Sequence, residues 1–481
     1  MTGHRLLAGA ASLDLVPPLG MTMVGHLRRS VSAQRYGAPL QVGALVLDDS
    51  HERLVIVSAD VIATPGTYAT RLREAIAQAA DTEPCHVLVN SSHSHAAPPL
   101  PGMPKLGGLE RRWTESELRF PETLIELASS AASLAVSRLR PARVGAARVE
   151  ASDLSVNRRQ RDSELGTIMG WNPDEACDRG VPVLRIDDLA GASITTLVCY
   201  ACHPVVVGPD VADFSSDFVG SLRSHVRRGT GGDCQFLQAC GGNILPLEAF
   251  FDRQGPEEDF GRRLALHALL AREWAETMPT QVKETPYASA HKIAVWRREP
   301  TGKEHDYSLG AAERTVRIPL QSPPGLDEIR SLRNDLERRV EDLKQSGAPP
   351  EEWNPPSIHI DWAADIERSI LDGAVSRELE APIQALRIGK IGIVALPFEP
   401  FCEIGLEINA HSPASFPITL GYSNDALGYL PTEREFGLRG YEPTISHRHY
   451  GKPSPVVADA AQLVVRESLE LIATLFASEL P

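Results

Sequence analysis

Residues 87–98 read VLVNSSHSHAAP, an apolar strand-like run that leads into two histidines and ends at a proline. Side chains two positions apart on an extended chain lie on the same face, so His93 and His95 point the same way. Two imidazoles at the end of a strand can bind one metal ion, or one can bind the metal and the other the substrate. This stretch indicates a metal site, with a surface loop or hydrogen-bonded core histidines as alternatives.

Two later segments have a similar construction, residues 197–207 (LVCYACHPVVV) and residues 391–400 (IGIVALPFEP). In the first, His203 directly precedes a proline, and a buried histidine there is costly unless its nitrogens are satisfied. In the second, Glu399 follows an apolar strand in a loop stiffened by two prolines, where a carboxylate can be the anionic member of a metal site. A hydrogen-bonded core histidine and a solvated loop glutamate are the competing interpretations.

Residues 422–432 (YSNDALGYLPT) are turn-rich, and the residues RGYE follow at 439–442. By themselves these two segments predict only a loop. In this order, after the three strand-end segments, they resemble the catalytic domain of the neutral/alkaline non-lysosomal ceramidase family. The resemblance spans most of the chain and begins at residues 11–14 (ASLD), which are similar to that family's opening strand.

The resemblance implies a zinc site. In that family zinc is held by the first histidine of the His-x-His motif, a His-Pro histidine, a glutamate after a late strand and a tyrosine. Position by position, these roles carry over to His93, His203, Glu399 and Tyr429. The segment before Tyr429 departs from the pattern, because Ala426 stands where the family usually has an aromatic residue.

The resemblance also implies residues that contact the substrate. In that family the second histidine of the pair and a later tyrosine face the substrate carbonyl, which points here to His95 and Tyr441. An arginine after an asparagine lines the site there, and Arg158 after Asn157 matches it.

One departure concerns the reaction itself. Ceramidases carry a Gly-Asp-x-Ser-Pro motif whose serine lies beside the zinc, and the matching residues 242–246 read GNILP, with Leu245 in place of that serine. A leucine can neither attack a carbonyl nor donate a proton. Because zinc lowers the pKa of bound water from about 15.7 to roughly 7, we expect direct attack by metal-bound water. His95 and Tyr441 would then donate hydrogen bonds to the negative charge that develops on the substrate oxygen.

Several further polar residues have two interpretations each. Arg158 is expected to hold an anionic or polar substrate group, or else to form a structural salt bridge. Asn243 is expected to bind substrate or to brace its loop, and Cys240 is an alternative nucleophile. Asp60 and Asp217 are candidates for carboxylates that orient the ligand imidazoles, with structural capping as the competing account.

Composition narrows the functional class. The chain of 481 residues is 42% hydrophobic, which allows a large core, and its net charge of −15 argues against binding nucleic acid or anionic membranes. No apolar run approaches the roughly 20 residues of a membrane span. Seven cysteines and an amino terminus without a signal-peptide pattern favour reduced thiols in a cytoplasm. A small soluble substrate is therefore favoured over ceramide. For the oligomeric state, a homo-oligomer remains an open expectation.

Apolar spacing predicts helices over residues 70–80, 122–139, 216–228, 257–278 and 458–476. These helices alternate with strands, which predicts one α/β domain over residues 1–481 with a mixed β-sheet core flanked by helices. We expect the ceramidase-like catalytic domain without the C-terminal β-sandwich common in that family. Residues 320–350 predict a charged helical insertion that is solvated on the outside, or else a lid or subunit contact. A second His-x-His pair, at 447–449, follows no apolar strand and is interpreted as a loop, with substrate contact as the alternative.

The sequence as a whole predicts a zinc-dependent hydrolase that cleaves an amide or ester bond of a small soluble substrate. A metal-dependent lyase or isomerase is one alternative, in which the ion acts on a carbonyl without net hydrolysis. A non-catalytic binding protein that kept the fold and lost the chemistry is the other.

Overall fold

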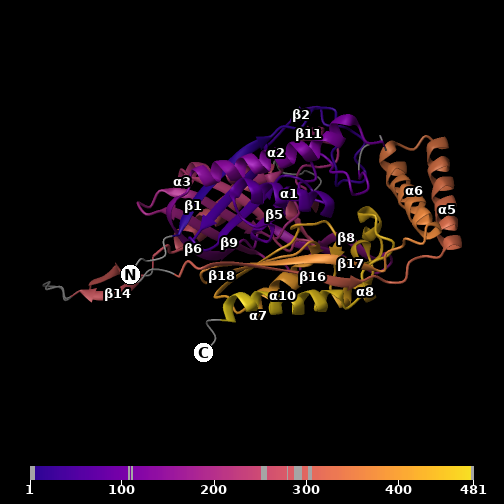
Figure 1. Cartoon of the computed structure of the whole chain (residues 1–481). Coiled ribbons are helices and arrows are strands. Elements are labelled where there is room, and N and C mark those ends of the chain that lie inside the picture. The colour runs from indigo at the N-terminus through magenta and orange to yellow at the C-terminus, as the bar shows by residue number, and fades with distance from the viewer. Residues whose placement is uncertain are drawn as a thin grey trace.

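Two β-sheets packed against each other form the centre of the protein in the computed structural model (Figure 1). The structure describes residues 6–106, 109, 112–250, 257–278, 280–285, 295–301 and 306–477. The first sheet has eight strands in the order β12-β10-β9-β6-β1-β3-β4-β5, with parallel and antiparallel neighbours. Its strands are β1 (Leu7–Leu15), β3 (Leu40–Asp48), β4 (Arg53–Ala59), β5 (Val87–Ser91), β6 (Arg140–Glu150), β9 (Gly180–Asp188), β10 (Ser193–Tyr200) and β12 (Asp233–Gln238).

Both faces of the first sheet are apolar. Successive side chains of a strand point to opposite sides, and in these strands apolar residues occupy both sets of positions. In β3, Val42, Ala44 and Val46 join the hydrophobic cluster under the helices, whereas Leu45 and Leu47 join the cluster toward the second sheet. The helices that cover the outer face are α1 (Gly66–Ala80), α2 (Glu115–Ser137), α3 (Phe218–Thr230) and α4 (Glu257–Trp274). The four helices predicted here are confirmed, with shifted ends.

The shift is clearest in α2, which begins seven residues before its predicted start at residue 122. The side chain of Thr114 accepts a hydrogen bond from the backbone N–H of Glu117, and the Glu117 carboxylate accepts one from the backbone N–H of Thr114. This capping box satisfies orphan N–H groups of the first turn, so the helix starts before its apolar spacing becomes regular.

The second sheet has four strands in the order β16-β17-β18-β20. They are β16 (Leu309–Pro319), β17 (Glu378–Ile388), β18 (Ile391–Ala395) and β20 (Phe416–Leu420). Its far face packs against α7 (Cys402–His411) and α10 (Ala460–Phe476), so the layers run helices, sheet, sheet, helices (Figure 1). The α/β class with a mixed sheet flanked by helices is confirmed. The second sheet is an addition that the sequence analysis did not predict.

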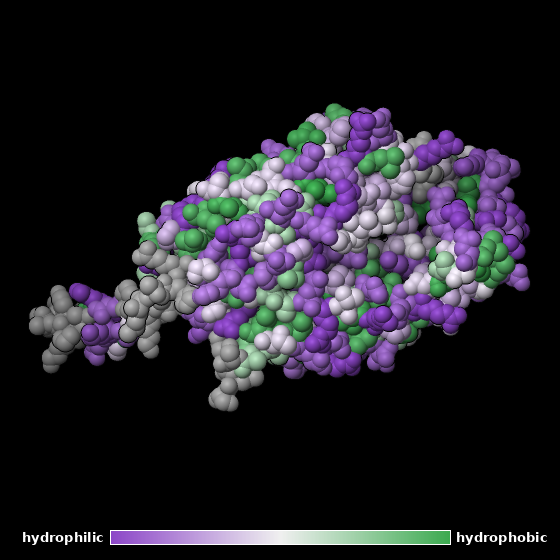
Figure 2. All heavy atoms as spheres, viewed as in Figure 1, coloured by the Kyte–Doolittle hydropathy of each residue, from purple (hydrophilic) through white to green (hydrophobic). Residues whose placement is uncertain are grey.

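A helical hairpin is inserted between β16 and β17 and stands at one end of the molecule (Figure 1). It consists of α5 (Leu326–Gln345) and α6 (Pro350–Leu371). Helix α5 matches the predicted charged helix, and in Figure 2 the surface over the hairpin is mainly hydrophilic. Helix α6 was not predicted, because two prolines, Pro355 and Pro356, lie inside it and usually interrupt a helix.

Shorter elements connect these layers. The small sheets are β2 (Arg35–Tyr36) with β11 (Asp213–Phe214), β13 (Ile244–Pro246) with β7 (Ser155–Asp162) and β8 (Gly166–Asn172), β14 (Thr280–Thr285) with β15 (Val295–Pro300), and β19 (Glu399–Pro400) with β21 (Tyr429–Leu430). The short helices are η1 (Pro84–His86), η2 (Leu247–Phe250), α8 (Glu433–Leu438), α9 (Tyr441–Thr444) and η3 (Ser446–Tyr450). Within the described part of the chain, every helix is too short or too polar to cross a membrane.

Candidate metal centre

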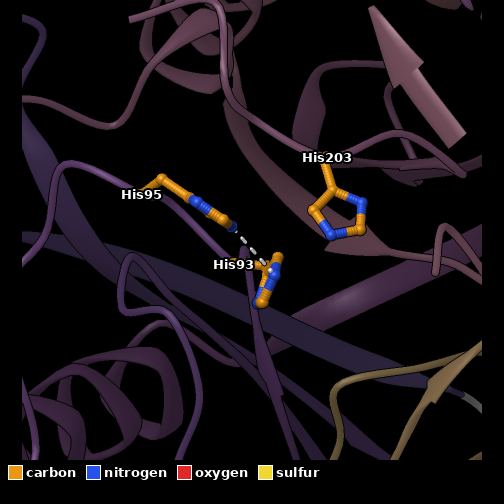
Figure 3. Close-up of side chains that lie close together, drawn as sticks. All are labelled: His93, His95 and His203. Atoms are coloured by element: carbon orange, nitrogen blue, oxygen red, sulfur yellow. Dashed lines mark hydrogen bonds between the residues drawn. The ribbon is translucent and has the colours of Figure 1, made fainter. Parts of the chain in front are cut away.

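Three segments, each of which follows a buried strand, meet at one point. His93 follows β5 by two residues, His203 follows β10, and Glu399 follows β18. Glu399 opens the short strand β19 and pairs there with Tyr429 of β21, in parallel. Figure 3 shows His93 and His95, from one segment, close to His203, from another. The ligand atoms that these three histidines offer all lie within 4.8 Å of one another.

Four donor atoms converge there at short, similar distances. Oε2 of Glu399 lies 3.1 Å from Nε2 of His203 and 3.3 Å from Nε2 of His93. The hydroxyl of Tyr429 lies 3.4 Å from Nε2 of His203. All four side chains are buried, with exposed fractions of 8% or less. The four residues named as zinc ligands by the family resemblance are therefore neighbours in space, although 306 residues separate His93 from Glu399.

Backbone carbonyls hold the two imidazoles in one orientation. Nδ1 of His93 lies 2.7 Å from the carbonyl oxygen of Ile62, and Nδ1 of His203 lies 2.8 Å from that of Gly241. A carbonyl oxygen can only accept, so each Nδ1 carries a proton, and Nε2 of the neutral ring has a lone pair. This lone pair is the one that faces Glu399. Outer partners of this kind commonly fix the tautomer of metal-binding histidines.

The carboxylates considered for this orienting role are engaged elsewhere. Asp60 accepts hydrogen bonds from Arg223 and from the backbone N–H of Gln41. Asp217 accepts from the backbone N–H of Phe218 at the start of α3, as the capping account predicted. The interpretation of Asp60 and Asp217 as imidazole-orienting carboxylates is wrong, because the structure gives that task to main-chain oxygens.

The backbone at His93 lies in the left-handed region, with φ of 66°. This conformation is uncommon for residues other than glycine and costs of order 1 kcal/mol or more, so it persists only where its surroundings enforce it. Here the backbone N–H groups of Ser92 and His93 donate to the carbonyls of Ala59 and Val61. Enforced strain of this kind is concentrated at functional sites.

The electrostatics of the cluster suit a cation. Burial, assisted by the positive charge of Arg158, lowers the pKa of His203 to about 4, so this ring is neutral at pH 7. Burial by itself would raise the pKa of Glu399, but the adjacent His93 and His203 hold it well below its usual range, so Glu399 is an anion. The lone pair of the neutral His203 ring thus faces the Glu399 carboxylate at 3.1 Å, and Nε2 of His93 lies 3.3 Å from the same carboxylate oxygen. Such an arrangement is repulsive unless a positive charge occupies its centre.

The donor set and its spacing fit zinc. Atoms bound at about 2.0–2.1 Å around a tetrahedral ion lie about 3.3 Å from one another, and zinc favours nitrogen and oxygen donors of this kind. The three separations given above, 3.1, 3.3 and 3.4 Å, match that spacing. The residues present therefore fit a tetrahedral divalent ion.

His95 lies beside the four donors with one nitrogen unpartnered. Its Nε2 lies 3.1 Å from Nε2 of His93, while its Nδ1 is buried without a hydrogen-bond partner. Arg29 donates to the carbonyl of His95, and the ring of His26 packs edge-on at 5.1 Å. A Cβ at Gly25 would lie 2.5 Å from the His95 ring, so only glycine allows this close approach. Sequence analysis missed His26 and Arg29, which carried no motif.

Arg158 and Tyr441 border the opposite side of the cluster. Arg158 is buried and donates to the hydroxyl of Tyr429 at 3.0 Å and to the carboxylate of Glu442 at 2.8 Å. The structural salt bridge considered for Arg158 is therefore present. The ring of Tyr441 packs against Tyr429 with 5.7 Å between centroids, and its hydroxyl lies 2.8 Å from Nδ1 of His449.

Three other residues named from the sequence have protein partners or apolar surroundings. Asn243 is fully buried, donates to Glu403 and accepts from the backbone N–H of Cys402, so it braces its loop. Cys240 is buried, and burial raises the pKa of its thiol well above the usual value. Leu245 lies in β13, buried opposite Val156 of β7.

Tyr422 is a site residue that sequence analysis did not name. Its hydroxyl donates to Oε2 of Glu399 at 3.4 Å, and its ring lies 4.5 Å from that of His93. The available signal was its position at the start of the turn-rich segment that also carries Tyr429.

The fold is that of the ceramidases, as the resemblance predicted. A ceramidase complexed with C2 matches with a TM-score of 0.67 and 15% identity, covering 99% of this chain and 76% of that chain. Neutral ceramidase from Pseudomonas aeruginosa matches with a TM-score of 0.65 and 16% identity, covering 98% and 74%. Comparisons of the sequence with protein-family models and with curated proteins give no match.

Proposed function

We propose that this protein is a zinc-dependent hydrolase that cleaves an amide or ester bond of a small soluble substrate. One observation carries the proposal: two imidazoles, a carboxylate and a phenol meet in a buried cluster with the spacing of a tetrahedral zinc site. The likeness of the fold to that of a solved ceramidase supports the reaction class.

In this proposal the zinc ligands are His93, His203, Glu399 and Tyr429. A zinc ion bound there would supply Lewis-acid polarisation of a substrate carbonyl and, by taking water in addition to its four protein ligands, hydroxide at neutral pH. Arg158 supports the proposed ligand Tyr429, because its N–H donates to the oxygen of Tyr429 and favours the charged form of that phenol. Since Arg158 is buried between Tyr429 and Glu442, its proposed role is to support this ligand, with substrate contact secondary.

His95 and Tyr441 stabilise the charge that develops during the reaction. Burial lowers the pKa of His95 well below its usual value, so the ring is neutral and can donate from one nitrogen. Its Nε2 lies 3.1 Å from Nε2 of His93, so a proton on this nitrogen faces the cluster. Burial raises the pKa of Tyr441, so its hydroxyl keeps its proton and remains a donor. A donor directed at a developing oxyanion contributes about 3 kcal/mol to the lowering of the barrier.

The chain offers no nucleophile of its own at the serine position of the ceramidases. Leu245 is a buried hydrocarbon there, and the raised pKa of the Cys240 thiol keeps that residue protonated and unreactive. Water is therefore the attacking group in the proposal. We also propose a reducing, cytoplasmic compartment, because the seven cysteines are all free thiols.

The proposal is tested by comparing zinc-loaded and chelator-treated protein on 4-nitrophenyl acetate and on a set of N-acyl 4-nitroanilides. We expect product release only from the zinc-loaded form, with products that have gained one water by mass spectrometry. The His93→Ala variant should bind no zinc and release no product. Zinc-loaded protein that cleaves none of these bonds would contradict the proposal, and products without added water would favour a lyase or isomerase.

A further inference from the structure

A second group of histidines connects the inserted hairpin to Tyr441. His359 lies on α6, and its Nε2 is 3.0 Å from Nε2 of His449 in η3. Nδ1 of His449 is in turn 2.8 Å from the hydroxyl of Tyr441. His449 is 1% exposed, so water does not interrupt this chain at its centre. The sequence analysis had interpreted His449 as a loop residue.

The two imidazoles are neutral, and this restricts where their protons can be. Burial lowers the pKa of His449 to about 3 and that of His359 to about 4. A neutral ring has one N–H, and a hydrogen bond between two Nε2 atoms needs a proton on one of them and a lone pair on the other. Two arrangements of protons along the chain therefore remain.

The two arrangements differ in what they do to Tyr441. If His449 donates from Nε2, its Nδ1 has only a lone pair, and the hydroxyl of Tyr441 must donate to it. If His359 donates from Nε2, then His449 carries its proton on Nδ1 and donates to the oxygen of Tyr441. Only the second arrangement leaves the O–H of Tyr441 free to donate to another acceptor.

Helix α6 is fixed in place on both sides of His359. Before it, Asn354 donates to the carbonyl of Leu27 at 3.2 Å. After it, Nε1 of Trp362 donates to the carbonyl of Lys452 at 2.9 Å, just beyond η3. These bonds tie the helix to the body of the protein and hold His359 at hydrogen-bonding distance from His449.

We propose that His359 is a positioning residue for the hydrolytic site: it donates from Nε2 to His449, which then donates from Nδ1 to Tyr441 and leaves the Tyr441 hydroxyl free for the substrate oxygen. The proposal rests on the proposed function for its catalytic meaning. It gives the inserted hairpin a role, because α6 supplies the residue that sets the proton arrangement of the site.

The first test reads the tautomer directly and needs no substrate. Protein labelled with ¹⁵N-histidine is examined by NMR, and the ring of His449 is identified by the signals lost in His449→Gln. We expect the proton of His449 on Nδ1 in the wild type and in His359→Gln, whose amide can replace the Nε2 donor. In His359→Leu the proton should shift toward Nε2. A wild-type His449 protonated on Nε2, or a tautomer unchanged in His359→Leu, overturns the proposal.

The second test measures turnover of the zinc-loaded variants. We expect His359→Leu to lower kcat about tenfold with little change in KM, the scale of one neutral hydrogen bond, and His359→Gln to keep most of the activity. Arg368→Leu is a matched control, because Arg368 is exposed on the same helix and pairs with Asp365 of that helix. Equal kcat in His359→Leu and the control contradicts the positioning role.

The two tests separate this proposal from the proposed function. If the zinc-loaded protein hydrolyses nothing, the proposed function fails, while the NMR result still decides the hydrogen-bond arrangement. Thermal unfolding shows whether His359→Leu folds. If it does not, the wild type and His359→Gln still test the proposed hydrogen-bond arrangement. A His449 proton found on Nε2 in either protein contradicts the proposal.

Discussion

Two groups of histidines lie near Tyr441 and have opposite characters. In the first, Nε2 of His93 and Nε2 of His203 lie 3.3 and 3.1 Å from the Glu399 carboxylate. In the second, His359 and His449 bond to each other and to a hydroxyl, and none of the hydrogen bonds or ion pairs described for them involves a carboxylate. The first group is arranged to hold a cation, whereas the second is a chain of neutral hydrogen bonds.

The comparison shows that the groups around a histidine decide its chemistry. A backbone carbonyl at Nδ1 directs the lone pair of His93 or His203 toward a shared centre. At His449 both nitrogens bond to groups that can donate or accept, so its proton can occupy either position. A cation is also disfavoured at the second group by the guanidinium of Arg448, which lies over the ring of Trp362 at 4.8 Å.

The largest expected effect is on zinc binding. His93→Ala should abolish it, because the variant removes one of the proposed ligands, whereas His447→Ala should retain about one zinc per chain. Metal analysis of both purified variants measures this. Zinc lost from His447→Ala and kept in His93→Ala would contradict the assignment of the zinc site to the first group.

The second effect is a loss of stability in acid. Burial lowers the pKa of His203 to about 4 and those of His447 and His449 to about 3. The unfolded chain takes up protons at these rings near pH 6.5, but the folded protein does not. Stability is therefore complete above pH 6.5 and declines as the pH falls toward 4, by several kcal/mol in sum.

This decline can be divided between the two groups. The double variant His447→Gln/His449→Gln removes His449 from the second group together with the neighbouring ring of His447, so its unfolding temperature should fall less between pH 6.5 and 4 than that of the wild type. Thermal unfolding of metal-free protein across this pH range measures the difference. Identical pH dependence in both proteins would mean that these rings are protonated in the folded state.

A smaller effect is expected where the two groups meet, at Tyr441. Tyr441→Phe removes the hydroxyl that is proposed to donate to the substrate, so kcat should fall about 100-fold, equivalent to roughly 3 kcal/mol. Zinc content should not change. Tyr450→Phe is the matched control, since Tyr450 packs against Tyr429 at 6.2 Å. Equal rates for the two variants would remove Tyr441 from the mechanism.

The smallest effect is expected at Cys240. Its thiol donates to the carbonyl of Thr419, and burial raises its pKa well above the usual value. Cys240→Ser should keep zinc, and its turnover should stay within about twofold of the wild type, because an unactivated thiol contributes nothing to the attack. Loss of turnover with zinc retained would show that the first group depends on a nucleophile from the chain.

The first group was largely predictable and the second was not. His93, His203 and Glu399 each follow an apolar strand, and side chains at strand ends are brought together when the strands form a sheet. The tyrosines came only from the family resemblance, because Tyr429 and Tyr441 lie in segments whose pattern predicts a loop. His449 follows no strand, and its partner His359 lies 90 residues earlier, on a helix that contains two prolines.

Long-range backbone contacts explain the remaining differences between the site predicted from the sequence and the site in the structure. The carbonyls of Ile62 and Gly241 that orient His93 and His203 are 31 and 38 residues away in sequence, and every residue type has a carbonyl. Their role depends only on how the chain folds. For this reason the sequence pointed to the acidic residues Asp60 and Asp217, whereas the structure uses main-chain oxygens.

The most direct test of the first group is a crystal structure of the zinc-loaded protein with anomalous data collected at the zinc edge. We predict one strong peak, with Nε2 of His93, Nε2 of His203, Oε2 of Glu399 and the oxygen of Tyr429 at about 2.0–2.2 Å. A peak between His359 and His449, or no peak at either group, would contradict the account.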